Sequence, residues 1–229
     1  MGLIFVGSFI QSSIGFGLAI VAAPILYQIS PDYVPAPITI VALFLSLINA
    51  YRNKANISLD GLWMAIIGRV PGTVAGGALL LLVDNNTLSL WLGTMVLIAV
   101  GISLLPIRIA PTPKKMMAAG FFSGFMGTSS GIGGPPMALL LQHQEGHLVR
   151  ANLSAFFVVS CILSLAAQAP IGYMTMHHFM LSLPLLPASL LGYVVAMFFI
   201  DKLPKEKVRA ASLIICTISG ATAILTVLI

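Results

Sequence analysis

The sequence predicts an all-α polytopic membrane protein built from two inverted-topology repeats, each with a re-entrant broken-helix hairpin and three transmembrane helices. The first observation is composition, because 59% of the 229 residues are hydrophobic and 7% are charged, whereas soluble domains carry about 25% charged residues. The second observation is a glycine-rich interruption that occurs twice inside long apolar segments. The third is the position of lysine and arginine along the chain. Together they exclude a soluble domain and predict a protein that lies in the lipid bilayer.

Eight apolar segments follow one another, and six have the simple length of a spanning helix, which is roughly 20 residues. We predict a first repeat over residues 1–110, with a hairpin at 1–29 and helices at 34–50, 60–83 and 88–107. The second repeat covers residues 111–229, with a hairpin at 114–142 and helices at 150–170, 176–200 and 206–229. Hairpins are predicted at 1–29 and 114–142 because both segments are long and are interrupted by glycine in the middle.

A constant spacing relates the two halves. Gly15-Phe16-Gly17 recurs 116 residues later as Gly131-Ile132-Gly133. The pair Pro71 and Gly76 recurs as Pro187 and Gly192 at the same offset, and both prolines are candidate kinks. In hydrocarbon, an interrupted helix is tolerated only where it faces protein or a watery cavity. The two breaks therefore predict a site, and the N-termini of half-helices favour an anion there.

Basic residues decide how the segments cross the membrane. Cytoplasmic loops of membrane proteins carry an excess of lysine and arginine. If all eight segments span, the basic loops at 52–54 and 202–209 lie on opposite sides. If the two interrupted segments are re-entrant, ten of the eleven lysines and arginines fall on the cytoplasmic side, and the eleventh, Arg69, lies inside a helix. The distribution therefore favours the re-entrant arrangement and two repeats of opposite orientation.

The mid-chain stretch from Ser123-Gly124 through Gly131-Ile132-Gly133-Gly134-Pro135-Pro136, together with the earlier glycine-rich break, resembles the sulfite exporter TauE/SafE family. The resemblance covers essentially the whole chain, although Phe16 and Leu18 stand where glycines are often expected. It implies a multi-pass protein of the bacterial inner (plasma) membrane that moves small sulfur-containing oxyanions, namely sulfite, thiosulfate, sulfonates or related organosulfur anions. The residue pattern by itself indicates only a transporter that favours anions.

Arg69 is the sharpest candidate for substrate binding. It lies about ten residues into the segment 60–83, hence near mid-membrane, where a charge costs about 2.5–3.5 kcal/mol on insertion scales. Its planar guanidinium suits oxyanions such as sulfonate. Because no Asp or Glu lies at comparable depth, an anionic substrate is a natural counter-ion. The alternative is a structural arginine that binds the carbonyl ends of a broken helix.

The tips of the two predicted hairpins supply the other candidates. Small residues and hydroxyls let an oxyanion approach backbone N–H groups, and tight helix packing is the alternative explanation. The tip of the second hairpin contributes Thr128, Ser129, Ser130, Gly131, Gly133 and Gly134. The tip of the first contributes Gln11, Ser12, Ser13, Gly15 and Gly17. Gln168 is a weaker polar candidate near a helix end.

Other kinds of chemistry find little support. Cys161 and Cys216 lie in apolar helical segments, and His177 and His178 are adjacent, so neither pair presents a metal-ligand spacing. We therefore expect no cofactor, no metal and no enzyme activity. The expected partners are a small anionic substrate and the lipid bilayer, without nucleic acid, and a homodimer is an open alternative to a monomer.

We expect a secondary transporter that exports its anion by alternating access at a midplane site. A passive anion channel that uses the same tips as a filter is the first alternative. A metal-ion carrier and an intramembrane enzyme or membrane assembly factor rank lower. An enzyme would need acid–base or metal-binding groups at depth, and a metal carrier would need buried carboxylates or thiolates.

Overall fold

The structure of the protein is a computed structural model. It describes residues 1–58, 60–104, 110–141, 144–199, 213–214, 217–218, 220–222 and 224. Within these residues every regular element is a helix, which agrees with the all-α class predicted from composition. Among the described residues, three helical spans are long and apolar enough to cross a membrane, at Pro31–Arg52, Leu62–Leu82 and Gly146–Gln168, and a bent pair of helices makes a fourth if it is counted as one span. The protein is therefore a polytopic membrane protein.

The helices follow the predicted segments closely. The first half contains α1 (Gly2–Ile14), α2 (Leu18–Ile29), α3 (Ala36–Arg52), α4 (Leu62–Leu82) and α5 (Asn85–Leu104). The second half contains α6 (Pro113–Ser130), α7 (Gly134–Leu141), α8 (Gly146–Gln168), α9 (Met176–Ser182) and α10 (Leu185–Phe199). Short 3-10 helices, η1 (Pro31–Tyr33) and η2 (Lys54–Asn56), flank α3. Most of the predicted helix 206–229 lies outside the described residues.

One predicted helix differs from the structure. The segment 176–200 is divided into α9 and α10, which meet at an angle of 40°. The division falls at Pro184, one turn before the predicted kink at Pro187, because proline has no N–H to continue the helical ladder and its ring clashes with the preceding turn. By contrast, α4 continues through Pro71 as one helix.

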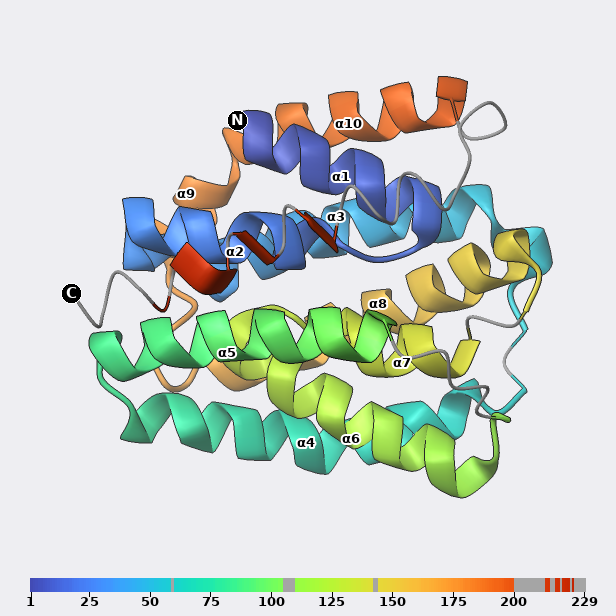
Figure 1. The fold of residues 1–229 in the computed structure, drawn as a ribbon, viewed down its shortest axis with the longest axis horizontal. Coiled ribbons are helices and arrows are strands. Elements are labelled where there is room, and N and C mark those ends of the chain that lie inside the picture. The colour runs from blue at the N-terminus through green and yellow to red at the C-terminus, as the bar shows by residue number, and fades with distance from the viewer. Residues whose placement is uncertain are drawn as a thin grey trace.

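Both glycine-rich breaks reverse the chain. Gly15 ends α1 with φ 99° and Gly131 ends α6 with φ 78°, a left-handed conformation that side chains disfavour. Each of these glycines donates its N–H to the carbonyl four residues earlier, at Gln11 and Gly127. Figure 1 shows the result: α1 folds back onto α2, and α6 folds back onto α7, so that each pair is a helical hairpin.

Positive charge gathers at one end of the helical bundle. Figure 1 shows that α3 ends, and that α4, α6 and α8 begin, on the right of the view. The described lysines and arginines near these helix ends are Arg52, Lys54, Lys114, Lys115 and Arg150. We call this the basic end. Among the described residues, Arg69 is the one lysine or arginine that lies elsewhere, in the interior of α4.

The closest packing in the bundle joins α4 to α6, with α1 against α10 and α3 against α8 as the next largest interfaces. A Cβ atom at Gly68 or Gly72 would lie 2.0 Å from a carbonyl oxygen of α6, and one at Gly76 would lie 2.5 Å from another. From the other helix, a Cβ at Gly120 would lie 1.9 Å from the Ala65 carbonyl oxygen. Glycines spaced by four thus let the two backbones touch.

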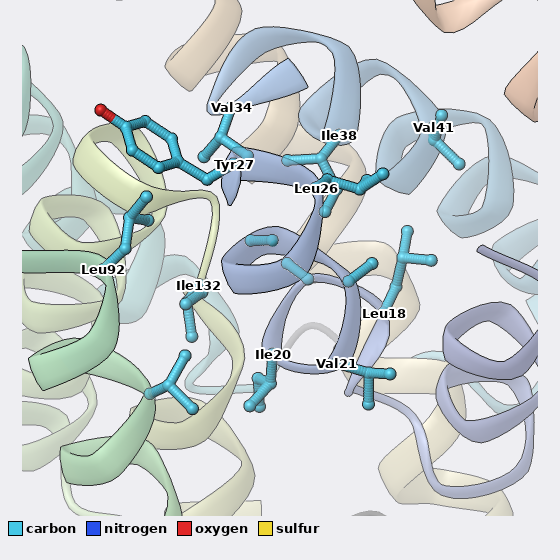
Figure 2. Packing of buried hydrophobic residues seen from close by; sticks show 14 of the residues in the cluster. Leu18, Ile20, Val21, Leu26, Tyr27, Val34, Ile38, Val41, Leu92 and Ile132 are labelled. Carbon is cyan, nitrogen blue, oxygen red and sulfur yellow. The ribbon is translucent and has the colours of Figure 1, made fainter. Parts of the chain in front are cut away.

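Apolar side chains fill the space around the breaks in two clusters. The larger cluster includes Leu18, Leu26, Ile38, Leu92 and Ile132, which come from α2, α3, α5 and the second break. Figure 2 shows these side chains converging between the helices. The smaller cluster joins α4, α6, α7 and α8. The two hairpins are therefore enclosed by the longer helices.

We predict that Gly72→Ala destabilises the protein. Its methyl group would meet the Phe121 carbonyl oxygen at 2.0 Å, and overpacking of this kind costs typically about 1–3 kcal/mol. Thermal unfolding in detergent should show a lower midpoint. Gly101→Ala in α5 is the matched control, because a Cβ there meets no atom within 4 Å. Equal midpoints for both variants would contradict the close contact between α4 and α6.

Candidate functional site

A buried cavity lies where the two breaks meet. Its volume is about 40 Å³, which is room for roughly three waters or one small solute. The wall contains Gln11 and Gly17 from the first hairpin, and Gly127, Gly131, Gly133 and Gly134 from the second. Arg69 of α4, Thr39 and Ala42 of α3, and Ser160, Cys161 and Ser164 of α8 complete much of the remainder. The cavity thus draws on both halves of the chain.

Arg69 is the cation of this cavity. Its side chain is 2% exposed. Nη1 donates to Ser123 Oγ at 2.8 Å, while Nη2 donates to Ser164 Oγ at 3.0 Å and to the Ser160 carbonyl oxygen at 3.2 Å. The guanidinium also lies over the Phe156 ring, 5.6 Å from its centroid. The arginine therefore connects α4 to α6 and α8.

Among the described residues, the hydrogen-bond acceptors around Arg69 are neutral oxygen atoms, two from serine hydroxyls and one from a backbone carbonyl. No carboxylate forms a salt bridge with it in this part of the chain, where Asp32 lies in η1 and the other described Asp and Glu residues lie in loops. Its Nε atom is buried and has no hydrogen-bond partner. A buried charge without a counter-ion is costly. The site can therefore gain stability by binding an anion.

Glycines bring the second break against this arginine. A Cβ at Gly127 would lie 2.9 Å from Arg69 Nη2, and one at Gly133 would lie 2.8 Å from the Ser123 carbonyl oxygen. Ser123 joins these parts, because its hydroxyl accepts from Arg69 and donates to the Gly133 carbonyl. The second break is thus held in place by the hydrogen bonds of the arginine.

Two helices begin at the cavity wall. α2 starts after Gly17 and α7 starts at Gly134, and both glycines line the cavity. The N-terminus of a helix carries partial positive charge and free N–H groups. At α2, the Leu18 N–H donates to Gln11 Oε1 at 3.3 Å. Pro135 and Pro136 remove two donors from α7.

The structure brings half of the predicted site residues to the cavity. These are Arg69, Gln11, Gly17, Gly131, Gly133 and Gly134. Gly15 lies at a second, smaller pocket beyond Gln11. The remaining predicted residues, Ser12, Ser13, Thr128, Ser129 and Ser130, are buried beside the breaks without lining the cavity.

The hydroxyls of those remaining residues bind protein groups. Thr128 Oγ1 lies 2.9 Å from Ser164 Oγ, and Ser129 Oγ accepts from Trp91 Nε1 at 3.0 Å. Ser130 donates to the Met126 carbonyl oxygen and Ser13 donates to the Phe9 carbonyl oxygen, as is common for serine within a helix. Ser12 Oγ accepts from Asn49 Nδ2 at 3.4 Å. These contacts fix the ends of α1 and α6.

Gln168, a weaker candidate, supports the second break. Its Nε2 donates to the Thr128 carbonyl oxygen at 2.8 Å, and its Oε1 is buried without a hydrogen-bond partner. Gln168 belongs with Ser160 and Ser164, because the three residues are spaced by four along α8 and share one helical face. Ser160 and Ser164 were not predicted from the sequence, although the spacing of four places them on the same helical face as Gln168.

These features define a class: a polytopic membrane protein in which two interrupted helices and a buried arginine enclose a small cavity. The family model of the sulfite exporter TauE/SafE matches residues 1–223. The protein belongs to this family, as the resemblance in the sequence predicted. No curated protein and no solved structure matched the chain. Family membership supports a multi-pass membrane transporter of sulfur anions.

We predict that Ser123→Ala loosens the second break. The variant removes the hydroxyl that donates to the Gly133 carbonyl and accepts from Arg69 Nη1, and loss of a partner for a buried polar group costs about 1–3 kcal/mol. The thermal midpoint in detergent should fall, and amide hydrogen exchange around residues 131–134 should become faster. Ser182→Ala is the control, because this equally buried serine bonds to the Phe179 carbonyl of its own helix. Similar exchange in both variants would contradict the role of Ser123.

Proposed function

We propose that the protein is a secondary transporter that exports a small sulfur-containing oxyanion, such as sulfite, thiosulfate or a sulfonate, across the inner membrane. The observation that carries this proposal is the buried charge of Arg69, which faces a small cavity and has neutral partners among the described residues. Such an anion is tetrahedral or pyramidal at sulfur, and two of its oxygens can accept hydrogen bonds from two N–H groups of one guanidinium. The choice of a sulfur-containing substrate rests on family membership.

An inverted repeat is the architecture that we propose for transport. Supporting contacts recur with the offset of 116 residues found in the sequence. Gly76 of α4 lies against Phe125 of α6, and Gly192 of α10 lies against Phe5 and Phe9 of α1, with the Phe5 carbonyl oxygen nearest. The two glycines are 116 residues apart, as are Phe9 and Phe125. These contacts support pairing the interface α4–α6 with the interface α1–α10, each of which joins a hairpin of one half to a helix of the other.

The hairpin tips suggest how access could alternate. A Cβ at Gly131 would lie 3.0 Å from Ile38 Cγ2 on α3, and a Cβ at Gly15 would lie 2.9 Å from Leu153 Cδ1 on α8. Each tip thus rests on a helix of the opposite half. In the proposed mechanism, movement of one half against the other lifts one tip at a time, so that the cavity opens to each side in turn.

We predict that Arg69→Gln weakens substrate binding. A hydrogen bond to a charged group is worth about 1.5–3 kcal/mol, so the affinity for sulfite, thiosulfate or methanesulfonate should fall at least about tenfold. In proteoliposomes, wild-type protein should take up labelled anion faster when the same anion is present on the opposite side, and the variant should not.

Two further variants control this experiment. Arg52→Gln makes the same charge change at an exposed position of the basic end and should transport as wild type. Arg69→Lys keeps the charge without the planar fork, so partial binding is expected. Wild-type binding by a folded Arg69→Gln protein would overturn the site, and uptake that ignores anion on the opposite side would indicate a channel.

We predict that Tyr33 and Glu145 lie on opposite sides of the membrane. Cysteines at these positions, in a protein without Cys161 and Cys216, should react with an impermeant thiol reagent from opposite faces. Glu145 belongs to the basic end and should react from the cytoplasm. Labelling of both positions from one face would contradict the proposed pair of re-entrant hairpins.

A further inference from the structure

The wall of the cavity between the two breaks offers one positive charge. Of the described residues that line it, Arg69 and Cys161 are the two with ionisable side chains. Cys161 is buried, and burial favours the neutral thiol over the thiolate. The other described lysines and arginines belong to the basic end. A solute in this cavity therefore meets a single cation.

Few hydrogen-bond donors in the described wall are free for a solute. Both Nη atoms of Arg69 bond to α6 and α8, whereas Nε is buried without a hydrogen-bond partner. Ser160 also lines the cavity, and its Oγ is likewise buried without a partner. The side chains of Thr39 and Gln11, which complete the polar part of the wall, already donate to protein oxygen atoms. These donors suit an anion with little charge to satisfy.

Much of the remaining wall is apolar. Its apolar side chains come from Phe16, Ala19, Ile20, Ala42, Ile132 and Phe157. A Cβ at Gly134 would lie 3.0 Å from Phe16 Cβ and 3.5 Å from Phe157 Cζ, so the two phenylalanines come together over this glycine. Figure 2 shows Ile20 and Ile132 among the packed side chains of the larger apolar cluster. Apolar groups do not solvate charge, so a second charge on the solute would have no partner on this side.

The balance of two energies decides how much charge such a cavity accepts. The cost of taking an ion out of water rises with the square of its charge, whereas its attraction to one cation rises in proportion to the charge. A doubly charged anion therefore meets about four times the cost and about twice the attraction of a singly charged one. It would also leave the loaded cavity with a net negative charge at depth in the membrane, which is costly. A singly charged anion leaves the loaded cavity neutral.

We propose that the Arg69 cavity selects singly charged oxyanions, such as hydrogensulfite or a small sulfonate, over doubly charged ones such as thiosulfate and sulfate. This inference rests on the proposed function, because it names the charge class of the substrate that the same site binds. The volume of about 40 Å³ limits the anion to roughly the space of three waters. Sulfite itself would be bound in its singly protonated form.

Two matched pairs of anions test the selection by titration calorimetry with the purified protein in detergent. Methanesulfonate and thiosulfate share an SO3 group, and a methyl group in the first stands where a charged sulfur stands in the second. Perchlorate and sulfate share a tetrahedron of four oxygens and differ in charge. The singly charged member of each pair should bind at least about tenfold more tightly. Equal binding within either pair, or tighter binding of the doubly charged member, would overturn the selection.

Sulfite provides the same comparison within one substance, because hydrogensulfite loses its proton near neutral pH. The affinity for total sulfite should be constant on the acidic side of this proton loss. On the alkaline side it should fall about tenfold for each pH unit, since one proton separates the bound form from the free form. Methanesulfonate keeps one charge throughout and should bind equally across this range. A sulfite affinity that ignores pH, or that rises with pH, would contradict the proposal.

A second cation in the wall should shift the preference toward two charges. Gln11 lines the cavity, and Gln11→Lys introduces an ammonium group of similar reach. At slightly acidic pH, where lysine is protonated, the affinity for thiosulfate relative to methanesulfonate should rise at least about tenfold. Gln11→Met is the neutral control and should keep the wild-type ratio of the two affinities. A wild-type ratio in a folded Gln11→Lys protein would count against selection by charge.

The choice of anions separates this inference from the proposed function. If perchlorate binds while neither methanesulfonate nor hydrogensulfite binds, the sulfur-containing substrate is wrong and the charge selection stands. If sulfur oxyanions bind and are transported without preference for the singly charged form, the charge selection alone is wrong. If none of these anions binds, both proposals are wrong.

Discussion

The contact between the backbones of α4 and α6 is the constraint on which the site depends. Glycines on both helices remove every Cβ that would separate them, and a Cβ at Gly124 would lie 2.5 Å from the carbonyl oxygen of Arg69. Because the helices touch at this level, the arginine reaches Ser123 on the partner helix and the glycines after it. The same small residues that bring the helices together therefore place the cation in the second break.

A charge placed this deeply is costly. Two serine hydroxyls and one carbonyl satisfy part of the guanidinium, and Nε is left without a partner. Neutral acceptors compensate less than a carboxylate would, which leaves free energy to be gained from an anion. A carboxylate in the same place would occupy the arginine permanently. In the proposed transporter, the neutral setting would therefore suit Arg69 to a solute that must also leave.

Local signals in the sequence predicted the breaks, the arginine and the helices around them. Proline, consecutive glycines and an isolated charge act within a few residues, so their effects can be read without the fold. The directions of hydroxyl groups could not be predicted from the sequence. Thr128 bonds to α8 and Ser129 bonds to Trp91, and both contacts depend on tertiary packing. The cavity residues Ser160 and Ser164 of α8 were not predicted for a related reason. Serines at every fourth position are also typical of helix packing, and only the neighbouring helices decide between the two uses.

The two breaks each turn at a left-handed glycine, but the side chains around them differ. Gly15 and Gly131 hold equivalent left-handed turns, and each tip rests on the long helix of the other half. Beneath one tip lie an arginine and a serine, and beneath the other a valine and an isoleucine. A symmetric plan would have equal barriers on both sides. The asymmetry of these side chains makes one barrier easier to hydrate than the other, and a directional preference for the anion can arise from that difference alone.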